Sequence, residues 1–473
     1  MIRFTKHNLS KHLCAIGLMI SLISGCTLTQ DYQRPPVDVP DKWRVDYSAA
    51  ADIANISWWN QFNDPVLNEL IETALNENKD LKIAAARVEE FIGRLKVTNS
   101  RFLPQIGYDA GTSRDSRSLE RSIPSLANAS QRSIPTFLTT IDVAWEFDIW
   151  GRLQRANEAT RAQLLSAEEG HQAVILTVVS NVAISYVEML CLEKELRIYK
   201  QTLAIRKDWL DLCEEKVSGG QLTDLELAQA RSAHEEIAVH IPKIERLIAL
   251  KENSLSVLLG RNPGAITTDK DLDMLVIPEL PSDLPSDLLA RRPDIKLKEQ
   301  NLIAANAQVE IARTQYLPAI SLTGLFGYAS DSLSNLFVSS ANLWQIGADT
   351  VGVIFDGGRI KGEVIQAEAI KEQLLNEYLL TIQTAFREVE DALVSLKKLK
   401  EIQKIQDRHL NALEDYVYHA RNRFDAGYVD YLVVMIAEKG LHNARINYAQ
   451  TEKDIFITII TFYKAIGGGW ING

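Results

Sequence analysis

The chain carries nearly the same series of motifs twice, and this duplication constrains its fold more than any other feature. The stretch RFLPQIGYDAG at 101–111 returns as QYLPAISLTG at 315–324. In the same order, EFDIWGRL at 146–153 returns as IFDGGRIK at 354–361. The separation stays between about 207 and 214 residues throughout. We therefore predict that the two halves of the chain are structural copies of each other.

The predicted organisation follows from these motifs. Residues 1–25 form a leader and 26–60 an extended linker, followed by repeat 1 at 61–277, a proline-rich connection at 278–292 and repeat 2 at 293–473. Each repeat is expected to contain a helix, two strands, a very long helix, a turn and a return helix.

The helical parts are marked by proline and glycine. A first helix is expected at 65–100 and its counterpart at 293–315, each ended by a Leu-Pro step. The long helices are expected at 153–217 and 360–424, which contain no proline. Sixty-odd helical residues span ~95 Å, so they require coiled-coil packing along their flanks.

The return helices are expected to start after two glycine-containing turns. Helix resumes at about Thr223 in repeat 1 and at about Asp430 in repeat 2. Pro242 is expected to kink the first return helix.

The strands, in hairpins at about 102–149 and 317–357, have one apolar and one polar face. In FLTTIDVAWEFDIW, one parity holds Phe137, Ile141, Val143, Trp145, Phe147 and Ile149, and the other holds Thr140, Asp142, Ala144, Glu146 and Asp148. This pattern suits a strand between hydrocarbon and water, and for any one strand a half-buried sheet face is the alternative. We predict that the acids facing the water-filled side are Asp142, Glu146 and Asp148. The fourth strand is expected to shift its parity near Asp349 through a bulge.

Four strands cannot close a barrel, since about eight are the minimum and lipid does not tolerate an open sheet edge. Copies of the chain must therefore pool their strands. Two copies would give eight strands and a filled interior, whereas three give twelve strands with room for water. The acidic face favours the water-filled solution, a homotrimer.

The N-terminus has the layout of a bacterial secretory signal. Arg3, Lys6 and Lys11 precede an apolar run that is too short to span a membrane, and Ile23-Ser24-Gly25-Cys26 resembles a lipobox. We expect cleavage before Cys26 and acylation of this new N-terminal cysteine. The alternative is an ordinary signal peptide with a cysteine nearby by chance. Thr27, which is not aspartate, favours the outer membrane.

Composition excludes several classes of protein. The net charge is −11, and removal of the three cations of the signal takes it to −14, which argues against nucleic-acid binding. Cys191 and Cys213 would lie ~33 Å apart on one helix, too far for a disulfide. Histidines lack metal-ligand spacing, and GGGW at 467–470 lacks the Lys-Ser/Thr of a phosphate-binding loop. We expect no enzyme activity, no catalytic residue, no metal and no cofactor apart from the lipid on Cys26.

One apolar stretch in the mature chain, at 173–190, has nearly the length of a membrane span. Polar residues recur along it at helical spacing, so we interpret it as a packed amphipathic helix.

With these features in place, the chain resembles the TolC-type outer-membrane efflux channels, in particular the lipoprotein branch of OprM/NodT-like outer-membrane factors. The matching stretches are SWWNQFNDPVLNELIETALNENKDLKIAAARVE (57–89), FDIWGRL, LLARRPDIKLKEQNLIAANAQVEIARTQYLPAISLTG (288–324) and FDGGRI. The resemblance implies a mainly α protein with a transmembrane β part: a trimeric 12-stranded barrel in the outer membrane, continued by a helical tunnel. It also implies two partners, a periplasmic adaptor (membrane fusion protein) and an inner-membrane pump of the resistance-nodulation-division (RND) type.

The resemblance further implies that two helical tips, at 217–225 and 424–432, meet the adaptor and close the resting channel. The candidate residues of these tips are Val217, Gly219, Gly220, Asp224, Leu225, Arg423, Asp425, Gly427, Asp430 and Leu432. Charges nearby that are further candidates are Asp211, Glu214, Glu215, Asp415 and Arg421. For each of them, an ordinary solvated position on a helix is the alternative.

The leading functional hypothesis is thus a passive conduit for small molecules, the outer-membrane channel component of a tripartite efflux system. The alternative is a periplasmic, lipid-anchored adaptor or coiled-coil scaffold. An adaptor carries one helical hairpin and lacks two pairs of amphipathic strands, so the duplication disfavours it.

Overall fold

A computed structural model of the chain describes residues 31–37, 57–116, 133–268, 270–278 and 291–468. The predicted signal at 1–25, Cys26 and most of the predicted connection at 278–292 lie outside the described residues.

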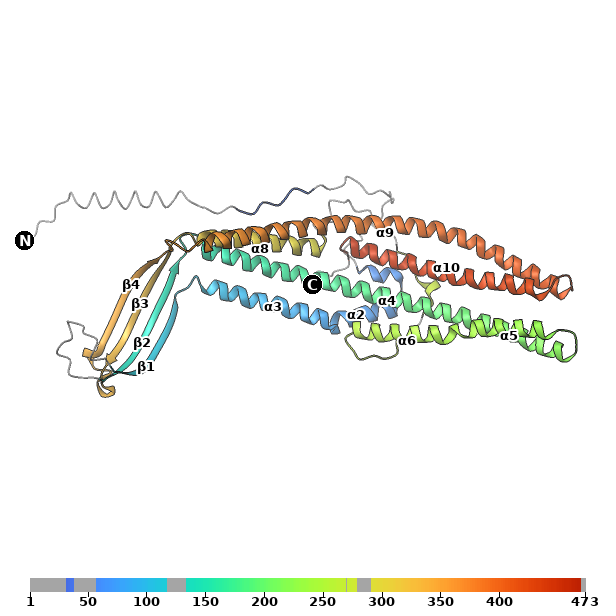
Figure 1. The fold of residues 1–473 in the computed structure, drawn as a ribbon, viewed down its shortest axis with the longest axis horizontal. Helices are drawn as coiled ribbons and strands as arrows, with labels where there is room; N and C mark the ends of the chain where they lie inside the picture. Colours follow the sequence, from blue (N-terminus) through green and yellow to red (C-terminus); the bar gives the residue numbers. More distant parts are fainter. Residues whose placement is uncertain (1–30, 38–56, 117–132, 269, 279–290, 469–473) are drawn as a thin grey trace, which may run out of the picture. The chain divides into compact units, whose positions relative to one another are not determined.

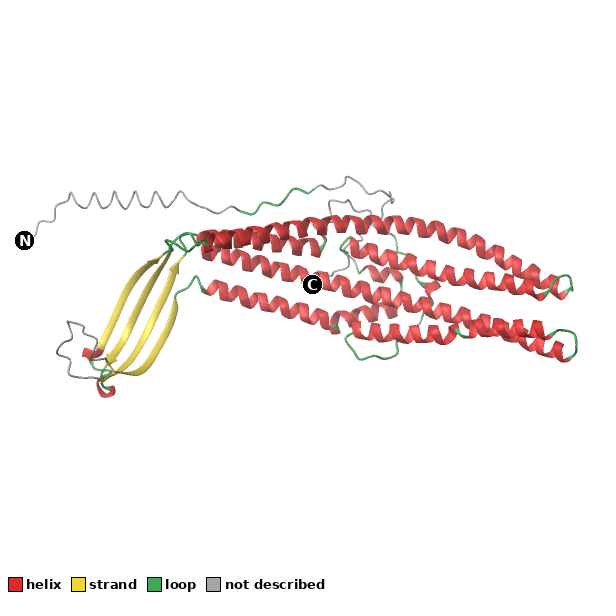
Figure 2. Ribbon diagram, viewed as in Figure 1, coloured by secondary structure: helices red, strands yellow, loops and turns green. Residues whose placement is uncertain are grey.

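The described chain is mainly helical, with one sheet (Figures 1 and 2). Its elements are η1 (Trp58–Phe62), α2 (Pro65–Glu77), α3 (Lys79–Ser100), β1 (Gln105–Ser116), β2 (Ser133–Phe147), α4 (Arg152–Ser218), α5 (Asp224–Ala238), α6 (His240–Leu258), η3 (Leu272–Met274), α8 (Pro293–Thr314), β3 (Ala319–Ser330), η5 (Leu333–Asn335), η6 (Ser339–Ala341), β4 (Asn342–Val351), α9 (Arg359–Asp425) and α10 (Tyr431–Ala465). α4 and α9 each contain 67 residues.

The chain divides into two compact units, and each unit takes segments from both repeats. Unit 1 comprises the described residues of Met1–Pro36, Glu89–Leu165 and Glu299–Asn376. Unit 2 comprises those of Val37–Val88, Ser166–Lys298 and Glu377–Gly473. The units therefore cut across the repeats, because α4 and α9 run through both.

Unit 1 contains an antiparallel sheet with the strand order β1-β2-β3-β4. In the β3–β4 ladder every residue from Ala319 to Tyr328 has one partner, from Val351 back to Asn342. The bulge expected near Asp349 is therefore wrong. β4 ends at Val351, so of the apolar residues that suggested a change of parity, Val353 and Phe355 lie beyond the strand.

The core of unit 2 is built around the N-terminal aromatic segment. Trp58 is fully buried and stacks on Tyr463 of α10, with ring centroids 5.4 Å apart. Asp64, also fully buried, accepts hydrogen bonds from the backbone N–H of Val66 at 2.9 Å and from the hydroxyl of Tyr186 at 2.8 Å. One carboxylate thus caps α2 and fixes it to α4.

The helix expected at 65–100 is two helices, which corrects the prediction. The break falls at Asn78, whose side-chain oxygen accepts from the Leu81 N–H at 3.1 Å. The amide of the same side chain donates to the carbonyl of Leu258 at 2.8 Å. Asn78 thereby caps α3 and holds the break against the end of α6.

The return helices of the two repeats differ. In repeat 1, α5 ends at Ala238 and α6 begins at His240. Pro242 has no N–H to donate to the carbonyl of Ala238, so the helix is interrupted there. α10, which contains no proline, is continuous over 35 residues.

Within the described residues, only α4 contains a stretch that is long and apolar enough to cross a membrane. Of the residues in that stretch, 61% are buried. Val179, Val182 and Tyr186 of this helix are fully buried in the core of unit 2. This packing agrees with the interpretation of 173–190 as a packed helix.

Candidate channel wall and helical tips

One face of the sheet is apolar from β1 to β4. Residues opposite each other in an antiparallel ladder point to the same side. Tyr108 lies opposite Ile141, Ile141 opposite Phe326, and Phe326 opposite Trp344. The same register places on this face Ile106, Val143, Trp145, Phe147, Ile320, Leu322, Tyr328 and Ile346. Tyr108 is 86% exposed and Trp344 70%, so nothing among the described residues covers this broad apolar face.

The opposite face carries carboxylates. Asp142 lies opposite Gly107 and Leu325, and Asp109 lies opposite Thr140. Glu146 lies opposite Ser321, which in turn lies opposite Asp349. Sequence reasoning missed Asp109 and Asp349. Each lies an odd number of residues from an apolar-face residue of the same strand, Tyr108 or Ile346, and this spacing indicates the opposite face.

Gly107 makes room for the carboxylate of Asp142. A Cβ atom at position 107 would lie 2.8 Å from both carboxylate oxygens of Asp142. The Asp142 side chain therefore lies over the backbone of β1.

The other two predicted acids have partners at the start of α4. Glu146 forms an ion pair with Arg152, at 2.6 and 2.7 Å from its guanidinium Nη2. Asp148 lies beyond the end of β2 and accepts from the backbone N–H groups of Leu153 at 2.9 Å and Gln154 at 2.8 Å. Asp148 is therefore a helix cap and not an acid of the sheet, which corrects its assignment to the wall.

The second copy of this motif does the same for α9. Asp356 accepts from the N–H groups of Gly358 and Ile360, both at 2.9 Å. These two hydrogen bonds to the charged form lower the pKa of Asp356. The repeated FD…GR motif is thus the device that starts each long helix after a strand.

The outer edges of the sheet are β1 and β4. Within the described chain, β1 pairs with β2 alone and β4 with β3 alone. The unpaired backbone groups on the far sides of β1 and β4 require a partner wherever the sheet meets hydrocarbon.

The two tips turn in the same way. At the first, Gly220 has φ +71°, and the N–H of Gln221 donates to the carbonyl of Lys216 at 2.8 Å. At the second, Gly427 has φ +76°, and the N–H of Tyr428 donates to the carbonyl of Arg423 at 2.8 Å. Each long helix therefore ends in a six-to-one hydrogen bond closed by a left-handed glycine.

Most of the predicted tip residues are exposed. Leu225 is 67% and Leu432 48% exposed, and Tyr428, which was not predicted, is 76% exposed. Val217 is half-buried, and the remaining candidates of the tips are exposed: Gly219, Gly220, Asp224, Arg423, Asp425, Gly427 and Asp430.

Three of the further charged candidates form ion pairs along the hairpins. Asp211 pairs with Lys207, and Glu214 lies 3.1 Å from Arg231. Arg421 of α9 lies 2.6 Å from Glu438 of α10. Glu215 and Asp415 are exposed.

Behind the tips lies an aromatic cluster that sequence reasoning missed. Trp209 of α4 stacks on Tyr431 of α10 with ring centroids 3.3 Å apart, and meets Phe424 of α9 edge-on at 5.3 Å. Burial raises the pKa of the Tyr431 phenol. Trp209 is more than 200 positions from Phe424 and Tyr431, so no local sequence pattern predicts that they meet.

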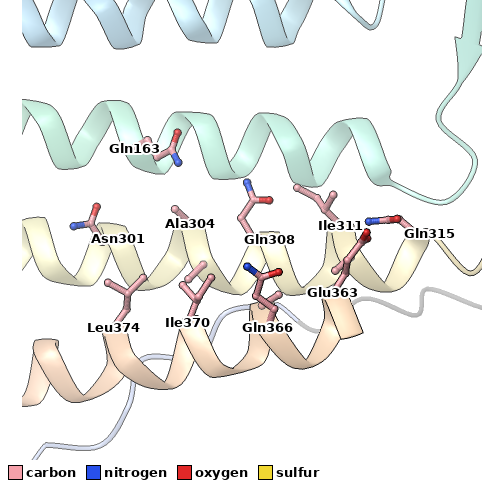
Figure 3. A pocket seen from close by; sticks show the side chains of 13 residues that line it. Gln163, Asn301, Ala304, Gln308, Ile311, Gln315, Glu363, Gln366, Ile370 and Leu374 are labelled. Carbon is pink, nitrogen blue, oxygen red and sulfur yellow. The ribbon is translucent and has the colours of Figure 1, made fainter. Parts of the chain in front are cut away.

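Unit 1 also holds a hollow of about 380 Å³ between α4, α8 and α9 (Figure 3). Amide side chains from all three helices line it: Gln163, Asn301, Gln308, Gln315 and Gln366. Glu363 is the one ionisable residue of this lining.

No group of three or more His, Cys, Asp or Glu side chains within the described residues is placed to share a metal ion.

Comparison with known proteins places the chain among transport proteins. A family model described as outer membrane efflux protein matches residues 70–261 and 284–468.

Relatives of the full length include three with informative names. The toluene efflux pump outer membrane protein TtgF of Pseudomonas putida is 32% identical over 473 residues, covering 98% of this chain and 97% of TtgF. The cation efflux system protein CusC of Escherichia coli is 34% identical over 460 residues, covering 95% and 96%. The probable outer membrane lipoprotein SilC of Salmonella typhimurium is 30% identical over 460 residues, covering 96% and 98%.

Solved structures show the same fold. A crystal structure of CusC superposes with a TM-score of 0.82 at 32% identity, covering 94% of this chain and 100% of that one. The Campylobacter jejuni outer membrane channel CmeC gives a TM-score of 0.86 at 25% identity, covering 94% and 96%.

Proposed function

This chain belongs to the outer membrane efflux protein family, and we propose that three copies of it form one channel with a shared 12-stranded barrel. The TolC-like fold, the outer-membrane location and the role as an efflux component are those of the family. The number of copies, the partners and the lipid anchor are what we propose for this chain in addition.

The observation that carries the proposal is the sheet of unit 1, with two unlike faces and two unpaired edges. Its apolar face suits hydrocarbon, and its other face presents Asp109, Asp142 and Asp349 to water. In hydrocarbon the edge of β1 must pair with the edge of β4 of another copy. Eight strands enclose an interior filled by side chains, whereas twelve leave an aqueous bore for these carboxylates.

The experiment is disulfide trapping between the two edges. We expect a scan of cysteines along β1, each combined with Ile346→Cys on β4, to yield covalent species up to three chains in denaturing gels. Cysteines at Thr139 and Tyr328, which face each other on β2 and β3 of one chain, are the matched control and should give single chains. A ladder that stops at two chains, or extends beyond three, contradicts the trimer.

The channel is proposed to be passive, and its driving force comes from partners. We expect the two tips to dock a periplasmic adaptor, which connects the channel to an inner-membrane RND pump. The exposed Leu225, Tyr428 and Leu432 support this because apolar side chains at a helical turn gain from burial against another protein. Adaptor binding would favour an open arrangement of the tips by binding it more tightly than the closed one.

The lipid anchor is proposed at Cys26. The described segment 31–37 lies against unit 1, where Asp31 pairs with Arg155 at 2.9 Å and Arg34 with Glu299 at 2.7 Å. The name of the relative SilC, a probable outer membrane lipoprotein, also supports this anchor.

A further inference from the structure

The segment that connects β3 to β4, residues 331–341, lies at the end of β4 that is remote from α9 (Figure 1). It contains the short helices η5 and η6, and η6 lies beside β3. Backbone hydrogen bonds form within the segment: the N–H of Asn335 donates to the carbonyl of Ser332 at 3.1 Å, and that of Ala341 to the carbonyl of Val338 at 2.9 Å. These bonds give the segment a defined conformation.

Phe337 of this segment packs on the apolar face of the sheet. Its ring meets that of Tyr328 edge-on, with centroids 5.6 Å apart, and Tyr328 meets Phe326 edge-on at 6.2 Å. Tyr328 and Phe326 are two residues apart in β3 and share the apolar face, where Phe326 lies opposite Trp344 of β4. The segment therefore places Phe337 on the side of Trp344 and not on the side of the carboxylates.

The surface of the segment is apolar and almost without charge. Phe337 is 73% exposed and Leu333 64%, and Val338 is also exposed. Asp331 is the one charged residue of 331–341. Removal of such apolar side chains from water is favourable, so this surface gains from an apolar partner.

The partner that this surface fits is lipid. In the proposed channel, on which this inference rests, the apolar face of the sheet meets hydrocarbon and the β3–β4 connection lies at the extracellular rim. Aromatic side chains gather where a barrel crosses from hydrocarbon to water. Phe326, Tyr328 and Trp344 form such a group on the strands, and Phe337 continues this group beyond the strands.

We propose that residues 331–341 lie on the outer leaflet of the outer membrane, with the ring of Phe337 among lipid acyl chains. The β3–β4 connection then turns outward onto the lipid, and this segment leaves the mouth of the bore uncovered.

Fluorescence quenching in proteoliposomes of the full chain tests this proposal. Phe337→Cys is labelled with a nitrobenzoxadiazole fluorophore, and the vesicles contain phosphatidylcholine with a doxyl group near the head of one acyl chain. We expect this lipid to quench the label at 337 at least twofold more strongly than a label at Gln345→Cys. Iodide on both sides of the vesicle should quench the label at 337 at least twofold less. Cys191 and Cys213 are buried, so the wild-type chain, treated in the same way, gives the background.

Two positions on β4 are the matched controls, because neighbouring side chains of a strand point to opposite faces. Trp344→Cys lies on the apolar face and should respond to the lipid quencher, whereas Gln345→Cys lies on the other face and should respond to iodide. Equal responses at 344 and 345 would contradict the shared barrel and this proposal with it.

Two results would overturn this proposal alone while 344 and 345 respond as expected. In the first, the label at 337 behaves like the label at 345, which would place the segment in water. In the second, neither quencher reaches the label at 337, which would mean that a neighbouring copy covers it.

A second variant avoids the bulky label. Phe337→Trp keeps an aromatic ring at this exposed position, and lipid with brominated acyl chains should quench the emission that the substitution adds to that of the wild-type chain. Added emission that brominated lipid leaves unchanged would likewise overturn the proposal.

Discussion

Asp142 and Val143 are adjacent in β2, yet their side chains point to opposite sides of the sheet. Parity in the sequence was sufficient to place them, because β2 alternates without interruption from Ile141 to Phe147. Asp109 escaped the same reasoning because glycine and small polar residues blur the alternation of β1. Asp148 was misplaced because β2 ends one residue earlier, where the carboxylate turns to the start of α4.

The first prediction at this scale contrasts the two faces. Val143→Lys is expected to block assembly in the outer membrane, because a lysine facing lipid costs ~2–4 kcal/mol near the bilayer midplane. Asp142→Lys should assemble normally and shift the channel away from cation preference. The amount of oligomer in outer-membrane fractions and the reversal potential in planar bilayers measure the two effects. Similar tolerance of lysine at both positions would contradict the assignment of the faces.

A second prediction concerns Gly260, at the end of α6. Its φ is +71°, and a Cβ there would lie 2.1 Å from the carbonyl oxygen of Glu77. Gly260→Ala should therefore destabilise unit 2 by more than ~1 kcal/mol, since both backbone strain and a clash with backbone arise. Gly264→Ala, where a Cβ meets nothing within 4 Å, is the control in thermal unfolding. Equal melting temperatures for the two variants would refute this role.

At the scale of elements, the long helices were predictable to within one residue at either end. The FD…GR motifs cap the starts of these helices, and the tip glycines end them. Both kinds of cap form between residues that are close in the sequence, so the sequence is sufficient to predict them. The break at Asn78 was missed, because apolar spacing continues through it and its second hydrogen bond goes to Leu258, 180 residues away. A hydrogen bond between residues so far apart in the sequence cannot be predicted from the local sequence pattern.

The caps lead to a prediction of pH dependence. The pKa of Asp356 is lowered in the folded chain, so its stabilising contribution is present above the unfolded value of ~3.9 and disappears as the pH falls through the folded value. Asp356→Ala should lower the melting temperature at pH 7, and the difference from wild type should shrink as the pH falls below the unfolded value and through the lower folded one. Asp331→Ala, at an exposed residue after β3, is the control. A difference that persists at low pH would argue against the cap.

At the scale of the whole molecule, the sequence indicated the need for several copies because four strands leave two edges unpaired. It gave no information on which residues of distant helices meet behind the tips, such as Trp209 and Tyr431. Nor does it indicate the exported compound, a choice that we expect to lie with the pump and adaptor.

The anchor is tested at this scale as well. Cys26→Ser should abolish incorporation of radiolabelled palmitate, because the acyl acceptor is removed. Cys213→Ser, at a buried thiol of α4, should leave labelling intact. Palmitate that still labels the Cys26→Ser protein would disprove the assignment.

The interruption at Pro242 has a consequence for symmetry. The return segment of the first hairpin is interrupted between α5 and α6, whereas that of the second hairpin, α10, is one continuous helix. A ring of three chains would present six hairpins of two alternating kinds, so its periplasmic mouth has threefold and not sixfold equivalence. A partner ring with six identical subunits would face two classes of docking position, with unequal affinities for successive subunits.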